Sequence, residues 1–175
     1  RICEAYEKSG CNREVVVNIQ GDEPFIMPSQ ISTVCDLFDS PETQIATLVK
    51  PFSANDSIAD LENPNSPKVV IDGAGNAVYF SRSIIPYLRG VEKSEWLKRH
   101  TFFKHIGLYA YKAEVLKQVT KMPQSTNEIC ESLEQLRWID NGLKIKVGQT
   151  ETQTIGIDTP EDMARAEEFL KSIEK

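Results

Sequence analysis

The sequence predicts an α/β protein, a three-layer sandwich with a mostly parallel central sheet and one added β-hairpin. Strand-like and helix-like segments alternate along the chain, as in sheets that are covered by helices. The 175 residues are 40% hydrophobic and 26% charged, which is the composition of a globular protein. A chain of this length can bury a core without disulfides or metals. We therefore expect residues 1–175 to form a single domain.

The first third of the chain predicts a βαβ unit. A short amphipathic helix is expected over residues 1–9. The run Val15–Gln20 is β-branched and apolar, as in a strand buried on both faces. Apolar residues recur at helical spacing in Gln30–Phe38, and a second strand is expected at Gln44–Val49. A polar loop with one helical turn around Ile58–Leu61 follows.

The rest of the chain predicts a hairpin and then alternating elements. Strands Val69–Ile71 and Ala77–Ser81 flank a turn that is rich in Gly and Asn, which tolerate positive φ. The remaining segments are expected to form, in order, a strand over Thr101–Tyr111 bent at Gly107, helices over Ala113–Met122 and Glu128–Asn141, an edge strand over Leu143–Val147, a short strand over Thr154–Ile157 and a helix over Pro160–Ile173. Gly142 is expected to end the helix before it in the left-handed conformation.

Charge and cysteine content narrow the possible functions. The formal net charge is −6 and no Lys/Arg run supplies a basic face, which argues against nucleic acid and anionic membrane as partners. The four cysteines form no CxxC pair, so we expect reduced thiols in a cytoplasmic protein rather than a zinc site. No apolar run approaches the ~20 residues of a membrane span.

Two aspartates follow predicted strands and are candidate ligands of a metal ion. In open α/β sheets, ligands bind beyond the carboxyl ends of the parallel strands. Asp22 follows the first strand and Asp158 follows the last one. Asp22 could instead be a turn residue, and Asp158 a helix cap, although Pro160 favours Thr159 as the cap. Two carboxylates in a chain without a His or Cys cluster suit Mg²⁺ that bridges phosphates.

Several other polar residues are candidate ligand contacts, each with a structural alternative. Arg82 at a strand end could grip a carboxylate, or it could be a solvated surface residue. His105 within an apolar strand is more often structural than a ligand. Helical spacing also groups three residues that could bind sugar hydroxyls or could be the wet face of a helix, namely Glu131, Glu134 and Gln135.

Five segments together resemble one known family. They are VNIQGDEPFIMP, YFSRSIIPYLR, KHIGLYAYK, ESLEQLRW and GIDTPEDM, and their order and spacing are similar to those of the CMP-Kdo synthetases, where Kdo is 3-deoxy-manno-octulosonate. The resemblance runs from Arg1 to the C-terminal helix. ESLEQLRW together with the strand that contains HIGLYAY distinguishes this family from other sugar nucleotidyltransferases.

The resemblance implies a fold, a reaction and a set of site residues. The fold is that of the nucleotide-diphospho-sugar transferases, the assembly is a homodimer, and CTP and Kdo react to give CMP-Kdo and pyrophosphate with Mg²⁺, which activates Kdo for lipopolysaccharide synthesis. By position, Asp22 and Asp158 resemble the metal ligands and catalytic residues. The residues that resemble sugar contacts are Gln20, Arg82, His105, Tyr109, Glu131, Glu134 and Gln135. We expect Arg82 and His105 to hold the sugar carboxylate, and the hairpin to form the dimer interface.

Two other functions remain open at this stage. The acceptor could be another acidic sugar, as in CMP-sialic acid synthetases. Alternatively, the chain could be a noncatalytic module that only binds or dimerises.

The family's N-terminal strand and its Gly- and Arg-containing loop, which cradles the CTP triphosphate, have no counterpart in these 175 residues. Arg1 resembles the Arg of an SGTDR segment that follows this loop in the family. We therefore expect these 175 residues to correspond to the larger, C-terminal part of the domain and to be inactive by themselves. Isothermal titration of the 175-residue polypeptide with CTP and Mg²⁺ is expected to show little or no binding, because the backbone donors to the triphosphate are missing. Micromolar affinity would contradict this expectation.

Overall fold

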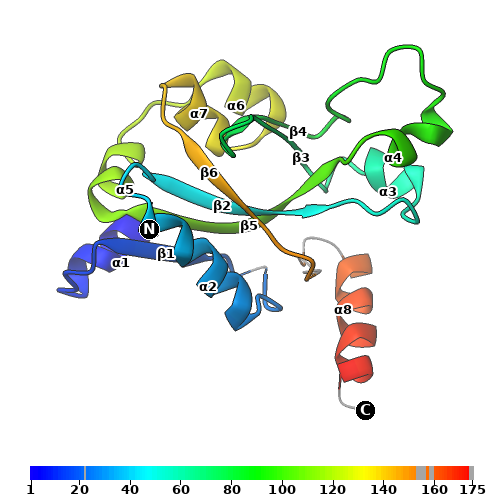
Figure 1. The fold of residues 1–175 in the computed structure, drawn as a ribbon. Coiled ribbons are helices and arrows are strands. Elements are labelled where there is room, and N and C mark those ends of the chain that lie inside the picture. The colour runs from blue at the N-terminus through cyan, green and yellow to red at the C-terminus, as the bar shows by residue number, and fades with distance from the viewer. Residues whose placement is uncertain (22, 153–156, 158–159, 174–175) are drawn as a thin grey trace.

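The computed structural model describes residues 1–21, 23–152, 157 and 160–173, which form a six-stranded sheet with helices on both of its faces (Figure 1). The strands are β1 (Val15–Ile19), β2 (Ile45–Pro51), β3 (Lys68–Ile71), β4 (Ala77–Ser81), β5 (Phe103–Lys112) and β6 (Ile145–Gln149). Their order is β4-β3-β5-β2-β6, and β1 also pairs with β5. The predicted α/β class with a central sheet and a β3–β4 hairpin is confirmed.

Strand β5 is bonded along both edges. β2 pairs with one edge, while β1 and β3 pair with opposite ends of the other edge. All three run antiparallel to β5, and β6 runs parallel to β2, so β1, β2, β3 and β6 share one direction. Because β5 inserts between β1 and β2, the strands of the expected βαβ unit are not adjacent. Among the described residues, β2 and β6 are the only parallel neighbours and the other adjacent pairs are antiparallel, so the sheet is mixed rather than mostly parallel as expected.

The helices are α1 (Ile2–Lys8), α2 (Pro28–Asp36), α3 (Ile58–Glu62), α4 (Trp96–Arg99), α5 (Ala113–Val119), α6 (Thr126–Glu131), α7 (Gln135–Asp140) and α8 (Pro160–Ile173). Single 3₁₀ turns cover Leu37–Asp39 and Lys93–Glu95. Helix α2 lies on one face of the sheet, and α6 and α7 lie on the other (Figure 1). No helix within the described part of the chain has the length and apolar character needed to cross a membrane.

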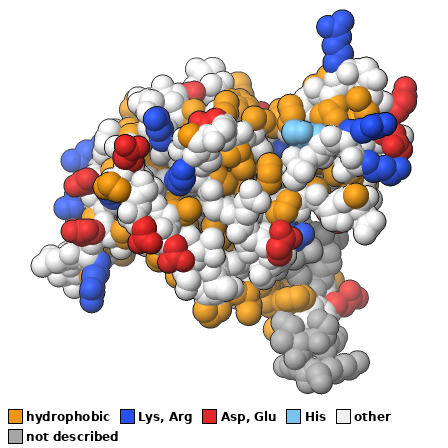
Figure 2. Space-filling view, in the orientation of Figure 1, with side chains coloured by type: hydrophobic (Ala, Val, Ile, Leu, Met, Phe, Trp, Pro, Cys, Tyr) orange, Lys and Arg blue, Asp and Glu red, His pale blue; other side chains and the backbone are white. Residues whose placement is uncertain are grey.

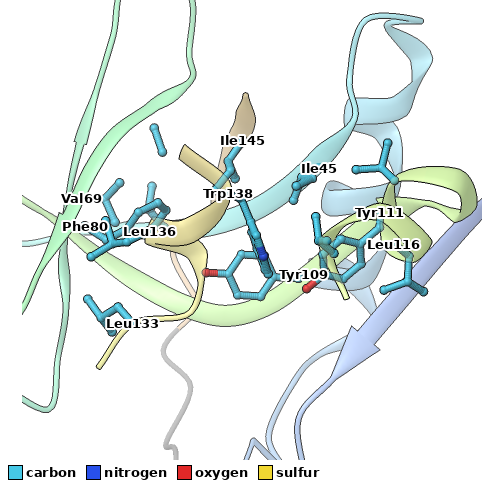
Figure 3. Close-up of a cluster of buried hydrophobic side chains, with 14 residues drawn as sticks. Ile45, Val69, Phe80, Tyr109, Tyr111, Leu116, Leu133, Leu136, Trp138 and Ile145 are labelled. Carbon is cyan, nitrogen blue, oxygen red and sulfur yellow. The ribbon is translucent and has the colours of Figure 1, made fainter. Parts of the chain in front are cut away.

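Two apolar clusters hold the three layers together. Ile45 and Val49 of β2 point into the cluster under α7, while Ala46 and Leu48 point into the cluster under α2. This alternation follows from the two-residue period of a strand, and it requires a strand that is apolar on both faces. The larger cluster, beneath α7, contains the aromatic rings of Tyr109, Tyr111 and Trp138 (Figure 3).

Most predicted boundaries agree with the structure to within a few residues. The expected bend at Gly107 is a β-bulge, because Thr47 pairs with Tyr109 while Leu48 pairs with Ile106. Gly142 has a φ of 79°, which confirms the left-handed cap. The strand expected at Thr154–Ile157 falls almost entirely outside the described residues.

The single helix expected over Glu128–Asn141 is wrong, because the segment is two helices. Helix α6 ends at Ser132, which adopts the left-handed conformation with φ 51°, and α7 begins at Gln135. Arg82 binds the end of α6, donating to Glu131 O at 2.7 Å and to Ser132 O at 3.3 Å. The break therefore turns the last carbonyls of α6 toward a side chain from another part of the chain, which helical periodicity cannot predict.

A buried ion pair holds the two helices together across this break. Arg137 donates through Nε to Glu128 Oε2 at 2.8 Å and through Nη2 to Glu128 Oε1 at 2.6 Å. The side chains are only 14% and 7% exposed. Burial by itself would raise the pKa of Glu128, but the hydrogen bonds and charge of Arg137, together with hydrogen bonds from Ser125 and Gln124, outweigh it and lower the pKa below its usual value. The pair thus fixes the orientation of α7 relative to α6.

Replacing Arg137 by Met is expected to lower the free energy of unfolding by about 3–5 kcal/mol, because Glu128 is left as an uncompensated buried charge. Urea denaturation followed by circular dichroism measures this loss. The double variant Glu128→Leu/Arg137→Met should recover part of it. The control Glu134→Gln removes an exposed partner that lies 3.4 Å from Arg137 and should cost below about 1 kcal/mol. Equal losses for Arg137→Met and Glu134→Gln would contradict the buried-pair interpretation.

Candidate functional site

The end of β1 meets β5 at Gly107. The side chains of Gln20 and Glu23 cover this glycine, and a Cβ there would lie 3.2 Å from Glu23 Oε1 and 3.8 Å from Gln20 Cδ. The missing side chain at position 107 thus makes room for both residues. Gln20 is thereby placed over the stretch of β5 that carries His105 and Tyr109, two other predicted sugar contacts.

His105 is held by a hydroxyl within the sheet. Its Nε2 lies 3.1 Å from the Oγ1 of Thr47. The single proton of Thr47 goes to a carbonyl of β5, at 2.9 Å to Leu108 O or 3.3 Å to Ile106 O. With the Thr47 proton on the nearer carbonyl, Leu108 O, Thr47 accepts from His105, which places a proton on Nε2 and leaves Nδ1 as an acceptor.

The imidazole of His105 is neutral. Its ring packs edge-on against Phe80 at a centroid distance of 5.2 Å, and it lies tilted against Tyr109, also at 5.2 Å. Burial among these rings lowers the pKa of His105 to about 3. A neutral ring with a free acceptor suits a hydroxyl group. This changes the role that we expect for His105, since a carboxylate would need a donor or a positive charge there.

Three buried polar atoms on facing elements lack hydrogen-bond partners within the described part of the chain. They are the hydroxyl of Tyr109 on β5 and, on α7, the amide nitrogen of Gln135 and the indole nitrogen of Trp138. The Tyr109 hydroxyl lies beside Thr47 without meeting the geometry of a hydrogen bond. Trp138 packs edge-on against Tyr109 at 5.2 Å, so α7 and β5 are in direct contact (Figure 3). Unpaired buried polar groups are costly and often mark a place that a ligand occupies.

Arg82 and Glu131 form a corner at the end of β4. The carboxylate of Glu131 accepts from Ser81 Oγ at 2.7 Å and from the backbone nitrogen of Arg82 at 2.9 Å. The Arg82 guanidinium donates to Glu131 O, Ser132 O and Pro64 O. These bonds account for three of its five N–H donors. The solvated-surface alternative for Arg82 is therefore excluded, because the side chain is built into the junction of three segments.

Glu134, the third residue predicted to bind sugar hydroxyls from a helix, lies at the solvent-exposed edge of the site. The Glu134 side chain is 65% exposed and 3.4 Å from Arg137. Burial raises the pKa of Tyr109 well above its usual value, and the charge of Glu134 adds to this effect. Glu134 therefore acts on Tyr109 from the solvent-exposed edge of the site, whereas Gln135 is buried.

The predicted metal ligands Asp22 and Asp158 lie outside the described residues. Within the described ranges, no group of three or more His, Cys, Asp or Glu side chains is arranged to hold a metal ion. The segment after β1 does contact the last helix, since the rings of Phe25 and Phe169 meet edge-on at 5.1 Å. This contact joins the segment after β1 to helix α8, and the carboxylate oxygens of aspartates are the donors that Mg²⁺ prefers.

Sequence reasoning missed the residues that support the site. Thr47 carried a signal, as a polar residue within the apolar strand IATLV. Lys68, Glu128 and Arg137 carried none, because their importance comes from contacts between distant segments. Trp138 was part of the ESLEQLRW motif, but its buried nitrogen becomes apparent only in three dimensions.

His105 is expected to stay neutral across the physiological range. In a His100→Gln variant it is the only histidine, so its ring protons can be followed by NMR as the pH is lowered. No titration is expected between about pH 8 and pH 5, because the folded-state pKa is about 3. The unfolded chain takes up a proton below about 6.5, so this residue lowers stability progressively as pH falls from there toward 3. A midpoint above 6 would contradict the burial of His105.

Comparisons with known proteins agree with this geometry. The sequence profile of the cytidylyltransferase family matches residues 1–145. The 3-deoxy-manno-octulosonate cytidylyltransferase of Bacteroides thetaiotaomicron is 62% identical over 98% of this chain and 69% of its own length. The enzyme of the same name from Phocaeicola vulgatus is 63% identical over 99% of this chain and 69% of its own length. The chain thus spans about two thirds of the length of these relatives.

Solved structures extend the likeness to three dimensions. A CMP:2-keto-3-deoxy-manno-octonic acid synthetase complexed with CTP superimposes with a TM-score of 0.83 at 34% identity, covering 97% of this chain and 66% of that one. The inositol-1-phosphate CTP transferase of T. maritima has a TM-score of 0.58 at 18% identity, covers 97% of this chain and 60% of that one, and shares the fold alone. The chain therefore belongs to the cytidylyltransferase family and, within it, to the 3-deoxy-manno-octulosonate cytidylyltransferases.

Proposed function

We propose that the protein containing this chain transfers CMP from CTP to Kdo, giving CMP-Kdo and pyrophosphate. The relatives with 62–63% identity over nearly the whole chain bear the name of this activity. The described site supplies the sugar-binding half of such an enzyme. Gln20, Arg82, His105 and Tyr109 stay proposed sugar contacts, together with the Glu131, Glu134 and Gln135 group.

The observation that carries the proposal is the set of buried polar atoms without partners. A ligand with several hydroxyl groups can satisfy the Tyr109 hydroxyl and the Gln135 amide together. The Arg82 corner adds a guanidinium whose remaining N–H donors suit a carboxylate. Hydroxyls together with one carboxylate describe an acidic sugar.

The reaction requires these residues to orient the sugar. The anomeric hydroxyl attacks the α-phosphorus of CTP in line with the departing pyrophosphate. Hydrogen bonds from neutral groups, such as His105 and Gln135, fix the ring without adding charge near the phosphates. Positioning of this kind supplies much of the rate in phosphoryl transfer, and no covalent enzyme intermediate is needed.

We further propose Mg²⁺ as the cofactor, with Asp22 and Asp158 as its ligands. When bound, the ion neutralises charge on the phosphate oxygens and on the pyrophosphate. The support is the hard oxygen donor set of the two carboxylates, which is the kind that Mg²⁺ prefers.

The setting of the protein is also part of the proposal. We infer a homodimer through the β3–β4 hairpin, supported by Val78 of the edge strand β4, which is 50% exposed. We infer a cytoplasmic protein that does not act on nucleic acid or membranes, supported by four free cysteines. On the face shown in Figure 2, the acidic and basic side chains of the described residues are interspersed rather than gathered by sign.

Release of pyrophosphate from CTP distinguishes the possible acceptors. The protein expressed from its natural start codon is expected to use Kdo with a kcat/KM at least about 100-fold above that for sialic acid, because buried groups built for one set of hydroxyls reject another. A preference for sialic acid would indicate the related synthetase. No release with either sugar would favour a noncatalytic module.

Asp22→Asn and Asp158→Asn test the metal ligands in the same assay. Each is expected to lower kcat by about a thousandfold or more, because the carboxylates hold the ion that stabilises the transition state. Asp36→Asn, an exposed residue at the end of α2, serves as the matched control and should leave kcat unchanged. Full activity in both variants would overturn the assignment of these ligands.

A further inference from the structure

Lys68, the first residue of β3, carries a charge into the interior. Its side chain is fully buried, with 0% of its surface exposed. The ammonium donates to Arg82 O at 2.7 Å and to Asn63 O at 3.0 Å. Burying an ammonium is costly even with such partners, and an apolar side chain could fill the same space. A purely structural role therefore does not explain why a cation stands here.

The contacts of Lys68 connect the two parts of the sugar-binding half. The loop that accepts from Lys68 at Asn63 also accepts from Arg82 Nη1, at Pro64 O and 2.9 Å. Lys68 and Arg82 thus bind neighbouring carbonyls of the same loop. On the other flank, the backbone nitrogen of His105 donates to Pro67 O at 2.9 Å, one residue before Lys68.

Among the described residues, side chains of both charges face Lys68. They are Glu131 from α6, Arg82 from the end of β4 and Lys104 from β5. Glu131 is the single carboxylate among them, and it already accepts from Ser81 and from the Arg82 backbone. With Lys68 protonated, Lys68 and Arg82 together carry two positive charges against the one negative charge of Glu131. Such an excess favours a ligand that brings its own negative charge.

We propose that Lys68 is a positioning residue for the acidic sugar, fixing the Arg82–Glu131 corner from within and supplying the positive charge that favours a carboxylate there. This inference rests on the proposed function. Lys68 acts through Arg82 and through its field, since its ammonium binds backbone carbonyls rather than the substrate.

The charge of Lys68 is sensitive to pH. Burial lowers its pKa to about 8; the charge of Glu131 opposes this shift, while Arg82 and Lys104 add to it. Use of Kdo should therefore decline as pH rises through 8. Unfolding does not explain such a decline, because the unfolded chain holds the proton up to about 10.5 and this residue makes the fold more stable as pH rises from 8.

Lys68→Met, which keeps an unbranched side chain one atom shorter and without charge, tests the inference in the protein expressed from its natural start codon. We expect the KM for Kdo to rise about 10- to 100-fold, the scale of a displaced binding group. The KM for CTP should stay within about twofold of its wild-type value. A similar rise in both KM values would instead indicate general damage to the protein. The control Lys112→Met removes a lysine that also donates to a carbonyl, Pro41 O, and should change neither constant.

The pH profile supplies a readout that a structural role would not move. Wild-type kcat/KM for Kdo should fall above pH 8, and this alkaline limb should be absent from Lys68→Met and present in Lys112→Met. If Lys68→Met does not fold, the pH profile of the wild-type protein still tests the inference. The decline above pH 8 must then appear in kcat/KM for Kdo and not in kcat/KM for CTP. Unchanged Kdo constants in a folded Lys68→Met protein, or no such limb in the wild type, would overturn the inference. Absence of wild-type activity with Kdo would overturn the proposed function instead.

Discussion

The pairing of β5 along both of its edges is the constraint on which the rest of the structure depends. Every described strand except β4 and β6 bonds directly to it. The side chains of Gln20 and Glu23, which follow β1, cover the bulge of β5 at Gly107. Tyr109 of β5 lies in the apolar cluster beneath α7, and His105 packs against Tyr109. A single ten-residue strand therefore aligns the end of β1 with the helices above the sheet.

The second constraint is the break between α6 and α7. A continuous helix would consume the carbonyls of Glu131 and Ser132 in its own hydrogen bonds. Ending α6 at a left-handed serine releases them to Arg82, and the Glu128–Arg137 pair keeps the two short helices in register. The helix is thus interrupted where the site uses backbone carbonyls as hydrogen-bond acceptors. Irregular backbone of this kind is common at functional positions.

Much of the fold could be predicted from the sequence, because Val15–Gln20, Gln44–Val49 and the hairpin carry strong local patterns. Pairing partners could not, since nothing local in β5 indicates that it inserts between β1 and β2. The same division holds for the site. Arg82, His105 and Tyr109 were found through motifs, but Lys68 and Thr47 matter through contacts with residues that lie 14 and 58 positions away in the chain. The neutrality of His105 follows from burial, which spacing along the chain does not reveal.

The unpaired Tyr109 hydroxyl and Gln135 amide have a consequence for molecular discrimination. A pocket lined only by hydrocarbon barely distinguishes compounds that differ by one oxygen. A pocket with buried donors and acceptors binds poorly any ligand that leaves these groups without hydrogen-bond partners. Deoxy analogues should therefore be excluded by what they lack rather than by their size. Selectivity of this kind resists added salt, because neutral dipoles are not screened as separated charges are.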